Sequence, residues 1–284
     1  MKIAQKNPAT IWVSSLSSTT SVKNYTSMLN TLSRYLGSDN LYSHEWKDMT
    51  YIDLIKLKRT LIDKGVQPSS INTYLTAVKA VMRESWRLQQ IDIETYMRIA
   101  DVKRVKGQSA TSGTALSKRE LNDLINYENG SIIPREARDS AIISIAYGAG
   151  LRRQEIVNLN LSDFQEKRVL VHGKGGYTTF VYLPDFTIKR IQHWVQIRGN
   201  FSGPLFNRLS IGRVITEYRL RANSLSEIVD RRCKLSGVRR ITPHDLRRSY
   251  ATNLINSGVD LFTVQKLMRH SDIETTRRYD MRDE

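Results

Sequence analysis

The chain has 284 residues, enough for one large domain or two of ordinary size, and 40% of them are hydrophobic, enough for a sizeable core. Its 44 Lys and Arg against 28 Asp and Glu give a net charge of +16, which favours a polyanionic partner, nucleic acid before an anionic membrane surface. The single cysteine, Cys233, excludes a disulfide framework or thiolate metal site within the chain, and no apolar stretch approaches the roughly 18 residues of a membrane span.

The N-terminal third of the sequence has apolar residues at helical spacing. A first helix is predicted to end at Gly37. A second begins at Thr50, where Asp53 stands three residues on as in a capping box. A third begins near Ser69, and a shorter fourth lies near residues 93–100. These signals predict a small all-helical domain.

A polar, basic segment, residues 103–114, interrupts this pattern and is interpreted as an interdomain linker. Beyond it, Ser117 and Glu120 form a second capping box. The helix that follows, around residues 137–147, is strongly apolar and therefore buried. Two glycines at 148 and 150 end it, and a short helix is predicted from Arg152 to Leu159.

Two β-type runs, residues 169–172 and 178–183, flank a Gly-Lys-Gly-Gly sequence and predict a hairpin with Lys174 at its turn. The remainder is predicted to be mostly helical. One helix begins at Thr242-Pro243, a capping hydroxyl followed by a proline at the first helical position, and ends near Gly258. Two more follow Asp260 and Asp272.

Four short motifs could carry chemistry, although each alone has an ordinary structural explanation. Arg152 and Glu155, three residues apart, fit a surface ion pair. Gly-Lys-Gly at 173–175 fits a plain hairpin turn. His244 and Arg247 fit solvated or core-satisfied side chains. Tyr279, nine residues after His270, fits an amphipathic surface residue. These readings stay open when each motif is considered by itself.

In this order, however, the motifs match one family. The chain resembles the tyrosine recombinases, which include phage-type integrases and Xer-type chromosome-resolving enzymes. The resemblance covers nearly the whole chain and is most specific in the stretches 147–159, 242–252 (TPHDLRRSYAT) and 267–279 (LMRHSDIETTRRY). The family pattern is Arg, Lys, His-x-x-Arg, His or Trp, then Tyr. It falls here on Arg152, Lys174, His244, Arg247, His270 and Tyr279.

The chemistry of DNA strand cleavage explains these residue types. A five-coordinate phosphorus carries negative charge on its non-bridging oxygens, which the planar guanidinium groups of Arg152 and Arg247 can bind with paired hydrogen bonds. The resemblance implies that Tyr279 is the nucleophile and that Lys174 protonates the departing 5′ oxygen.

The remaining site residues have supporting roles in this interpretation. His244 and His270 shuttle protons and hydrogen-bond the phosphate. Glu155, on the face of the helix that carries Arg152, orients the other groups. No metal and no other cofactor is expected, because the two arginines supply the positive charge and the phosphotyrosine ester conserves the bond energy.

The resemblance implies a mainly α fold with a small β-hairpin or sheet. Residues 1–104 would form a helical, SAM-like core-binding domain that binds DNA, 105–115 a linker, and 116–284 an α+β catalytic domain. The expected partner is double-stranded DNA with inverted-repeat core sites, bound by a homotetramer, with possible accessory proteins and no membrane. A cytoplasmic, nucleoid-associated protein is expected, since residues 1–16 lack the pattern of a signal peptide.

Two alternative functions share these features. One is a nicking and closing enzyme of the type IB topoisomerase kind, which uses the same nucleophile without exchanging partners. The other is a DNA-binding protein that keeps the fold without catalysis. One residue also departs from the family pattern, because Arg269 stands where glycine commonly precedes the second histidine. We expect either mild backbone strain at this turn or an added phosphate contact.

Overall fold

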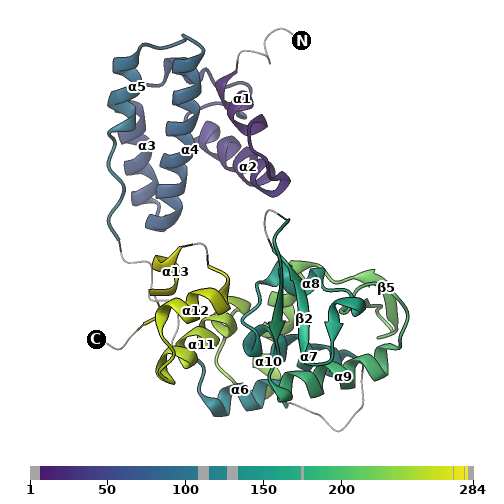
Figure 1. The fold of residues 1–284 in the computed structure, drawn as a ribbon. Helices are drawn as coiled ribbons and strands as arrows, with labels where there is room; N and C mark the ends of the chain where they lie inside the picture. Colours follow the sequence, from purple (N-terminus) through teal and green to yellow (C-terminus); the bar gives the residue numbers. More distant parts are fainter. Residues whose placement is uncertain are drawn as a thin grey trace. The chain divides into compact units, whose positions relative to one another are not determined.

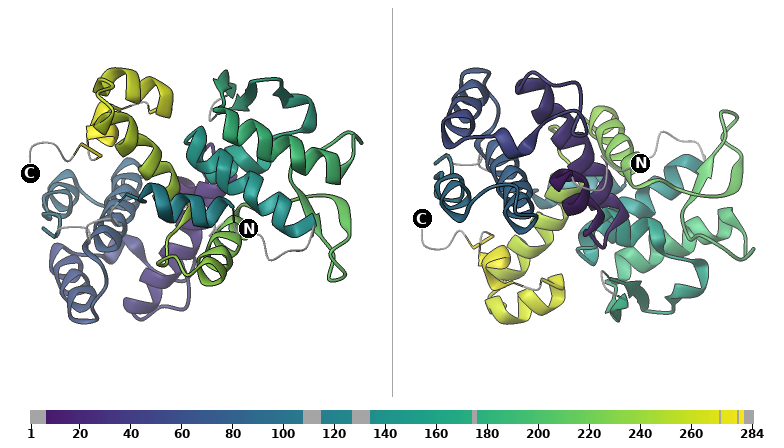
Figure 2. Two further views of the ribbon diagram at one scale, coloured as in Figure 1. Left: turned by 90° about the horizontal axis from the view of Figure 1, so that it is seen from below. Right: turned by 90° about the horizontal axis from the view of Figure 1, so that it is seen from above.

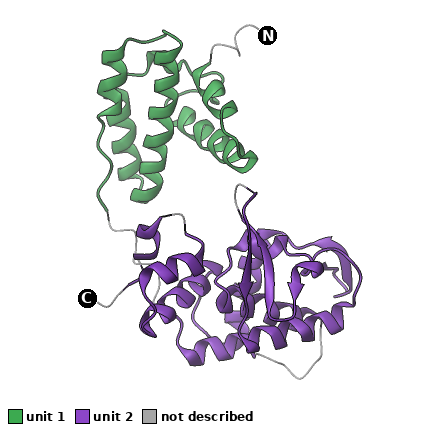
Figure 3. Ribbon diagram, viewed as in Figure 1, with its two compact units in different colours: residues 1–111 green, residues 112–284 purple. Residues whose placement is uncertain are grey.

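The computed structural model describes residues 7–107, 115–126, 134–173, 176–270, 272–277 and 279–280. The chain divides into two compact units, residues 1–111 and 112–284 (Figure 3). Most of the expected linker, residues 108–114, lies outside the described residues, as does Lys174.

Unit 1 is a helical assembly built around one central helix. Its elements are α1 (Pro8–Ser14), α2 (Thr19–Tyr35), a 3-10 turn η2 (Trp46–Asp48), α3 (Tyr51–Asp63), α4 (Pro68–Arg87) and α5 (Ile93–Ala100) (Figure 1). Helix α4 packs against the other four helices and η2. The capping box predicted at the start of α3 is present, because Thr50 and Asp53 bond each other's backbone amides. Helix α1, capped by Asn7, is an addition that the sequence analysis did not predict.

The chain that leaves α5 is fastened to unit 1 as far as residue 105. The Lys79 ammonium donates to the carbonyls of Ala100 and Val102, both at 2.6 Å. Asn72 exchanges two hydrogen bonds with the backbone of Val105. The first residues beyond α5 therefore belong structurally to the helical unit.

Unit 2 is mainly helical with two small antiparallel sheets, which confirms the predicted fold class. Its elements are α6 (Lys118–Ile125), α7 (Pro134–Gly148), α8 (Arg153–Asn158), η3 (Leu161–Asp163), β1 (Phe164–Gln165), β2 (Arg168–His172), β3 (Thr178–Tyr182), α9 (Asp185–Arg198), β4 (Asn207–Leu209), β5 (Ile215–Arg219), α10 (Ala222–Ser236), α11 (Pro243–Asn256), α12 (Leu261–Met268) and α13 (Ile273–Arg277).

The first sheet has the strand order β1-β2-β3, with Val169 opposite Val181 in the predicted hairpin. The second sheet, β4-β5, lies in the remainder of the chain, which is mostly helical as predicted, but these two short strands were not predicted. Tertiary contacts explain the difference. The buried Asn207 accepts from Arg138 through its carbonyl and from Arg198 through its side chain, and it donates to Thr216 on the opposite strand.

Helix α7 lies at the centre of unit 2. It is buried on nearly all sides, as its apolar sequence predicted, and it packs against α9 and α11. Helices α11, α12 and α13, yellow-green to yellow in Figures 1 and 2, follow in order: α11 packs against α7, α12 against α11, and α13 against α12. Because α7 ends at Gly148, the packing of its last turn sets the position of the turn that follows it.

Gly148 gives a test of this packing. A Cβ atom there would lie 2.3 Å from Oγ1 of Thr187 and 3.0 Å from Cγ of Pro184, at the start of α9. Replacing a helical glycine by alanine ordinarily stabilises a protein by up to about 1 kcal/mol. We expect Gly148→Ala instead to lower the free energy of unfolding by about 1–3 kcal/mol, because the methyl group overpacks the contact.

Denaturant unfolding measures this difference, and Gly237→Ala is the matched control. Gly237 has a φ of +68° with open space around its Cβ position, so only the left-handed conformation penalises that change, by roughly 1 kcal/mol. A Gly148→Ala protein more stable than the wild type would contradict the close packing of α7 on α9.

Candidate active site

The turn between α7 and α8 brings three parts of unit 2 together. Gly150 there has a φ of +56°, and a Cβ would lie 2.5 Å from the ring of Tyr250 on α11 and 3.1 Å from the sulfur of Met268 on α12. Glycine is thus required both by the backbone conformation and by the space available. Its carbonyl oxygen faces the arginine side chains of the site.

Arg152 stands at the N-cap of α8, one residue before the helix, so the expectation that it shares a helical face with Glu155 was wrong. The pair forms only the Glu155 half of a capping box, because the Arg152 guanidinium has no acceptor for the Glu155 amide. The Glu155 carboxylate accepts from the Arg152 amide and from its Nη1, both at 2.8 Å. Spacing of three residues fits either arrangement, and the extended backbone of Arg152 selects the cap. The Arg152 side chain remains 45% exposed.

Arg247 lies one turn into α11 and is buried. Its guanidinium donates to the carbonyl of Gly150 and to that of Met268. Burial, followed by the neighbouring charges of Arg152 and Arg269, lowers the pKa of Arg247 to about 10. The group therefore stays protonated at neutral pH, held among other positive charges.

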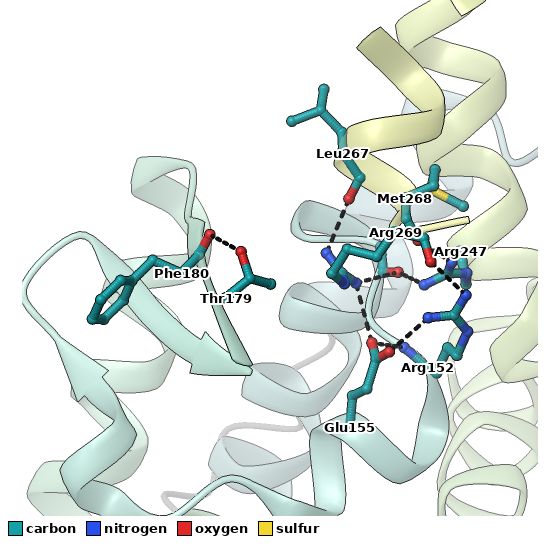
Figure 4. Close-up of polar contacts among 9 residues, drawn as sticks. Arg152, Glu155, Thr179, Phe180, Arg247, Leu267, Met268 and Arg269 are labelled. Carbon is teal, nitrogen blue, oxygen red and sulfur yellow. Dashed lines mark hydrogen bonds and ion pairs between the residues drawn. The ribbon is translucent and has the colours of Figure 1, made fainter. Parts of the chain in front are cut away.

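A third guanidinium enters the site from Arg269 at the end of α12 (Figure 4). The residue has φ 54° and ψ 44°, the left-handed conformation, so the backbone strain expected at this turn is present. Such a conformation costs a residue other than glycine about 1–2 kcal/mol. The side chain donates to Glu155 at 3.1 Å, to the Leu267 carbonyl at 2.9 Å and to the Gly150 carbonyl at 3.4 Å.

Glu155 is therefore a buried carboxylate between two guanidinium groups. Burial alone would raise the pKa of its carboxyl group, but the charges of Arg269 and Arg152, together with the hydrogen bonds from Arg152, lower the pKa below its usual value. Three arginines and one ionised carboxylate leave the site with excess positive charge.

Tyr279 lies beside both histidines of the predicted set. Its ring centroid is 6.5 Å from that of His244, at the start of α11, and 6.1 Å from that of His270, which follows α12. Tyr279 is only 6% exposed and packs among Val264, Met268 and other apolar side chains of α11 and α12. The phenol is thus held next to two imidazoles.

Both imidazoles are held in their neutral form at pH 7. Burial, reinforced by Arg247, Arg152 and Arg269, lowers the pKa of His270 to about 4. Burial likewise lowers the pKa of His244, although Asp245 opposes the shift. A neutral imidazole can accept a proton, as a protonated one cannot. The Nδ1 atom of His270 lies 2.9 Å from the Thr276 hydroxyl, which fixes the orientation of the ring.

Of the seven residues in the predicted set, the structure therefore brings six together. They are Arg152, Glu155, His244, Arg247, His270 and Tyr279. Lys174 lies outside the described residues. The strands on either side of it are described, and at their turn end His172 lies 3.5 Å from Asp163. Within the described ranges, no group of three or more His, Cys, Asp or Glu side chains could hold a metal ion.

Sequence reasoning missed two contributors to this site. Arg269 was noted as a departure from the family pattern, but nothing in the sequence linked it to Glu155, 114 residues away. Thr276, which bonds His270, gave no signal. The Gly150 carbonyl could be anticipated only in part, because a glycine after a helix indicates a turn and not what the turn contacts.

Comparison with known proteins gives consistent matches. The profile of the Phage integrase family matches residues 114–284. Tyrosine recombinase XerA of Thermococcus onnurineus is 30% identical over 234 residues, which cover 80% of this chain and 74% of the relative. Tyrosine recombinase XerC of Proteus mirabilis is 29% identical over 273 residues, which cover 91% and 82%.

Solved structures have the same fold. A lambda integrase dimer bound to a COC′ core site has a TM-score of 0.74 at 18% identity, covering 98% of this chain and 76% of that one. The Tn1549 transposon integrase in complex with a circular intermediate DNA also has a TM-score of 0.74 at 18% identity, covering 98% and 94%. No helix among the described residues is long and apolar enough to cross a membrane.

The lowered pKa of His270 predicts how stability depends on pH. Between pH 6.5, the ordinary pKa of histidine, and about 4, the unfolded chain protonates this ring while the folded protein does not. Stability should therefore fall as the pH falls through this window. In His270→Gln this part of the loss should vanish, on the order of 1 kcal/mol, because the ring is only partly buried and solvent screens the effect.

Urea unfolding of the wild type and His270→Gln at pH 7 and pH 4.5 measures the two slopes. An identical fall in the free energy of unfolding for both proteins would contradict the neutral, buried state of His270.

Proposed function

Because this chain belongs to the phage integrase family and is a tyrosine recombinase, a DNA breaking and rejoining enzyme, we propose that Tyr279 is its nucleophile and forms a 3′-phosphotyrosine bond with the cleaved strand. The observation that carries the proposal is the position of Tyr279 next to two neutral imidazoles and a cluster of arginines with excess positive charge.

The cleavage step balances with the groups of this site. The Tyr279 oxygen attacks phosphorus, and the bond from phosphorus to the 5′ oxygen breaks. The phenol proton passes to one of the neutral imidazoles, His244 or His270. Lys174 gives a proton to the departing 5′ oxygen; this assignment rests on the resemblance alone.

The arginines bind the charge that develops in this step. Arg152 and Arg247 hydrogen-bond the non-bridging oxygens as the phosphorus becomes five-coordinate. The bound phosphate also adds negative charge beside His270, which raises the pKa of its ring from about 4 and makes it a better proton acceptor during the reaction. Glu155 acts indirectly by holding Arg152.

Rejoining is the same chemistry in reverse. The 5′ hydroxyl of a partner strand attacks the phosphorus of the phosphotyrosine ester, the bond from phosphorus to the Tyr279 oxygen breaks, and Tyr279 leaves as a phenol. Since an ester replaces an ester, the bond energy is conserved and no external energy source enters the cycle.

The substrate is double-stranded DNA with inverted-repeat core sites, bound by four copies of the chain. The net charge of +16 supports DNA binding. Structural neighbours support the assembly, since they include a lambda integrase dimer bound to a core site and a lambda integrase tetramer bound to a Holliday junction. Residues 1–104 would bind the DNA as the helical domain and 116–284 would carry the catalysis.

Covalent capture tests this function. The protein is mixed with sheared genomic DNA of its source organism, denatured in detergent, and any DNA that stays attached is sequenced. We expect an adduct that is absent in Tyr279→Phe, while that variant keeps nearly the wild-type affinity for the recovered DNA because the hydroxyl contributes only to the chemistry.

Two outcomes would count against the proposal. Specific binding without any adduct, even on nicked substrates that trap the intermediate, would favour a DNA-binding protein without catalysis. An adduct that persists in Tyr279→Phe would assign the nucleophile to another residue.

A further inference from the structure

Arg269 adopts a backbone conformation that glycine would adopt without strain. Its φ of 54° and ψ of 44° place it in the left-handed region, at the residue that joins α12 to His270. A side chain that persists in such a conformation is usually held by its surroundings. The contacts of this side chain therefore indicate what it contributes.

The Arg269 guanidinium is enclosed by the site and does not extend into solvent. The side chain is 13% exposed and donates to Glu155, Gly150 and Leu267. Two of these acceptors belong to the turn and helix that carry Arg152 (Figure 4). These contacts give the side chain partners within the protein, which the expected alternative of an added phosphate contact did not include.

Arg269 also holds Arg152 from a second direction. Its backbone carbonyl accepts a hydrogen bond from Nη2 of Arg152 at 3.0 Å, while Nη1 of Arg152 binds Glu155 at 2.8 Å. Glu155 in turn binds Arg269 at 3.1 Å. The three residues thus form a closed ring of contacts, in which both terminal nitrogens of Arg152 have a fixed acceptor.

Loss of the Arg269 side chain would break this ring of contacts at Glu155, the most buried of the three residues. The charged groups that face Glu155 are Arg152 at the start of its own helix, Arg269 from the end of α12, and Arg247 from α11. Of these, Arg269 makes the contact that ties Glu155 to the segment carrying His270. Its loss would leave the carboxylate dependent on Arg152 alone for direct neutralisation.

We propose that Arg269 is a positioning residue: through Glu155 and its own carbonyl it fixes the guanidinium of Arg152 for phosphate binding, and it couples that arginine to the segment that carries His270. This inference rests on the proposed function, since it assigns Arg152 to the phosphate. A glycine at this position would relax the backbone but leave Arg152 and Glu155 less well ordered.

The first test compares Arg269→Gly with the matched control Arg213→Gly. Arg213, in the β4–β5 turn, has a similar φ of 62°, but its side chain is exposed. Both changes remove one charge and relieve the same type of strain. In single-turnover cleavage of a nicked substrate we expect Arg269→Gly to be slower by roughly 10- to 100-fold, with near wild-type DNA affinity, and Arg213→Gly to match the wild type.

The pH profile separates positioning from a structural defect. Removing the Arg269 charge raises the pKa of Glu155, so the carboxylate is protonated at a higher pH and Arg152 loses its partner earlier. The acid limb of the cleavage rate should therefore move to higher pH in Arg269→Gly. Added guanidinium ion should restore part of the rate. An unchanged rate and profile in Arg269→Gly would overturn the proposal.

A second measurement does not depend on cleavage. Carbon-13 NMR of the labelled Glu155 carboxyl group, assigned with Glu155→Gln, gives its pKa in each protein. We expect a higher pKa in Arg269→Gly than in the wild type or Arg213→Gly, and an equal pKa in all three would overturn the proposal. If the wild type forms no adduct, the proposed function fails, while this titration still decides whether Arg269 holds the carboxylate.

Discussion

The excess of positive charge at one point of unit 2 is the constraint on which the rest of the site depends. Arg152, Arg247 and Arg269 share one ionised carboxylate, Glu155, and like charges in a partly buried place repel each other strongly. The fold offsets this repulsion with backbone carbonyls, chiefly those of Gly150 and Met268. The remaining charge attracts an anion, and a phosphodiester bound there would complete the neutralisation that the protein leaves partial. Burial, reinforced by the same charge, keeps His270 neutral and therefore able to accept a proton.

The architecture serves to bring these groups together from distant parts of the chain. Gly150 allows the turn after α7 to pack directly against Tyr250 and Met268, so its carbonyl reaches both Arg247 and Arg269. Helix α11 is fixed at its start by the Thr242 and Asp245 capping box, which sets the position of His244. The neighbouring apolar cluster holds Tyr279 against α11 and α12. Small changes in the packing of α7, α11 and α12 would therefore alter the geometry of the whole site.

Local signals in the sequence predicted much of this arrangement. The capping boxes at Thr50 and Ser117 and the capping hydroxyl of Thr242 act within four residues, so they can be recognised without tertiary information. Strand β4 and strand β5 were missed because buried arginines from other helices hold Asn207. The Arg152–Glu155 pair was recognised, but its geometry was not, since two residues on one helical face and a residue that caps the helix start from its third position share the same spacing. The partner of Arg269 depends on a contact across 114 residues, which one sequence does not reveal.

The most direct test of the central claim is the pKa of His270 with and without DNA. Histidine-selective NMR labelling, assigned with His270→Gln, measures it in the free protein and in the complex with its captured DNA site. Burial together with the excess positive charge predicts a pKa of about 4 in the free protein, and the part due to charge predicts a clear rise in the complex, as the phosphate neutralises the arginines. A pKa that stays the same when DNA is bound would mean that no phosphate enters the cluster, and the account of the site would be wrong.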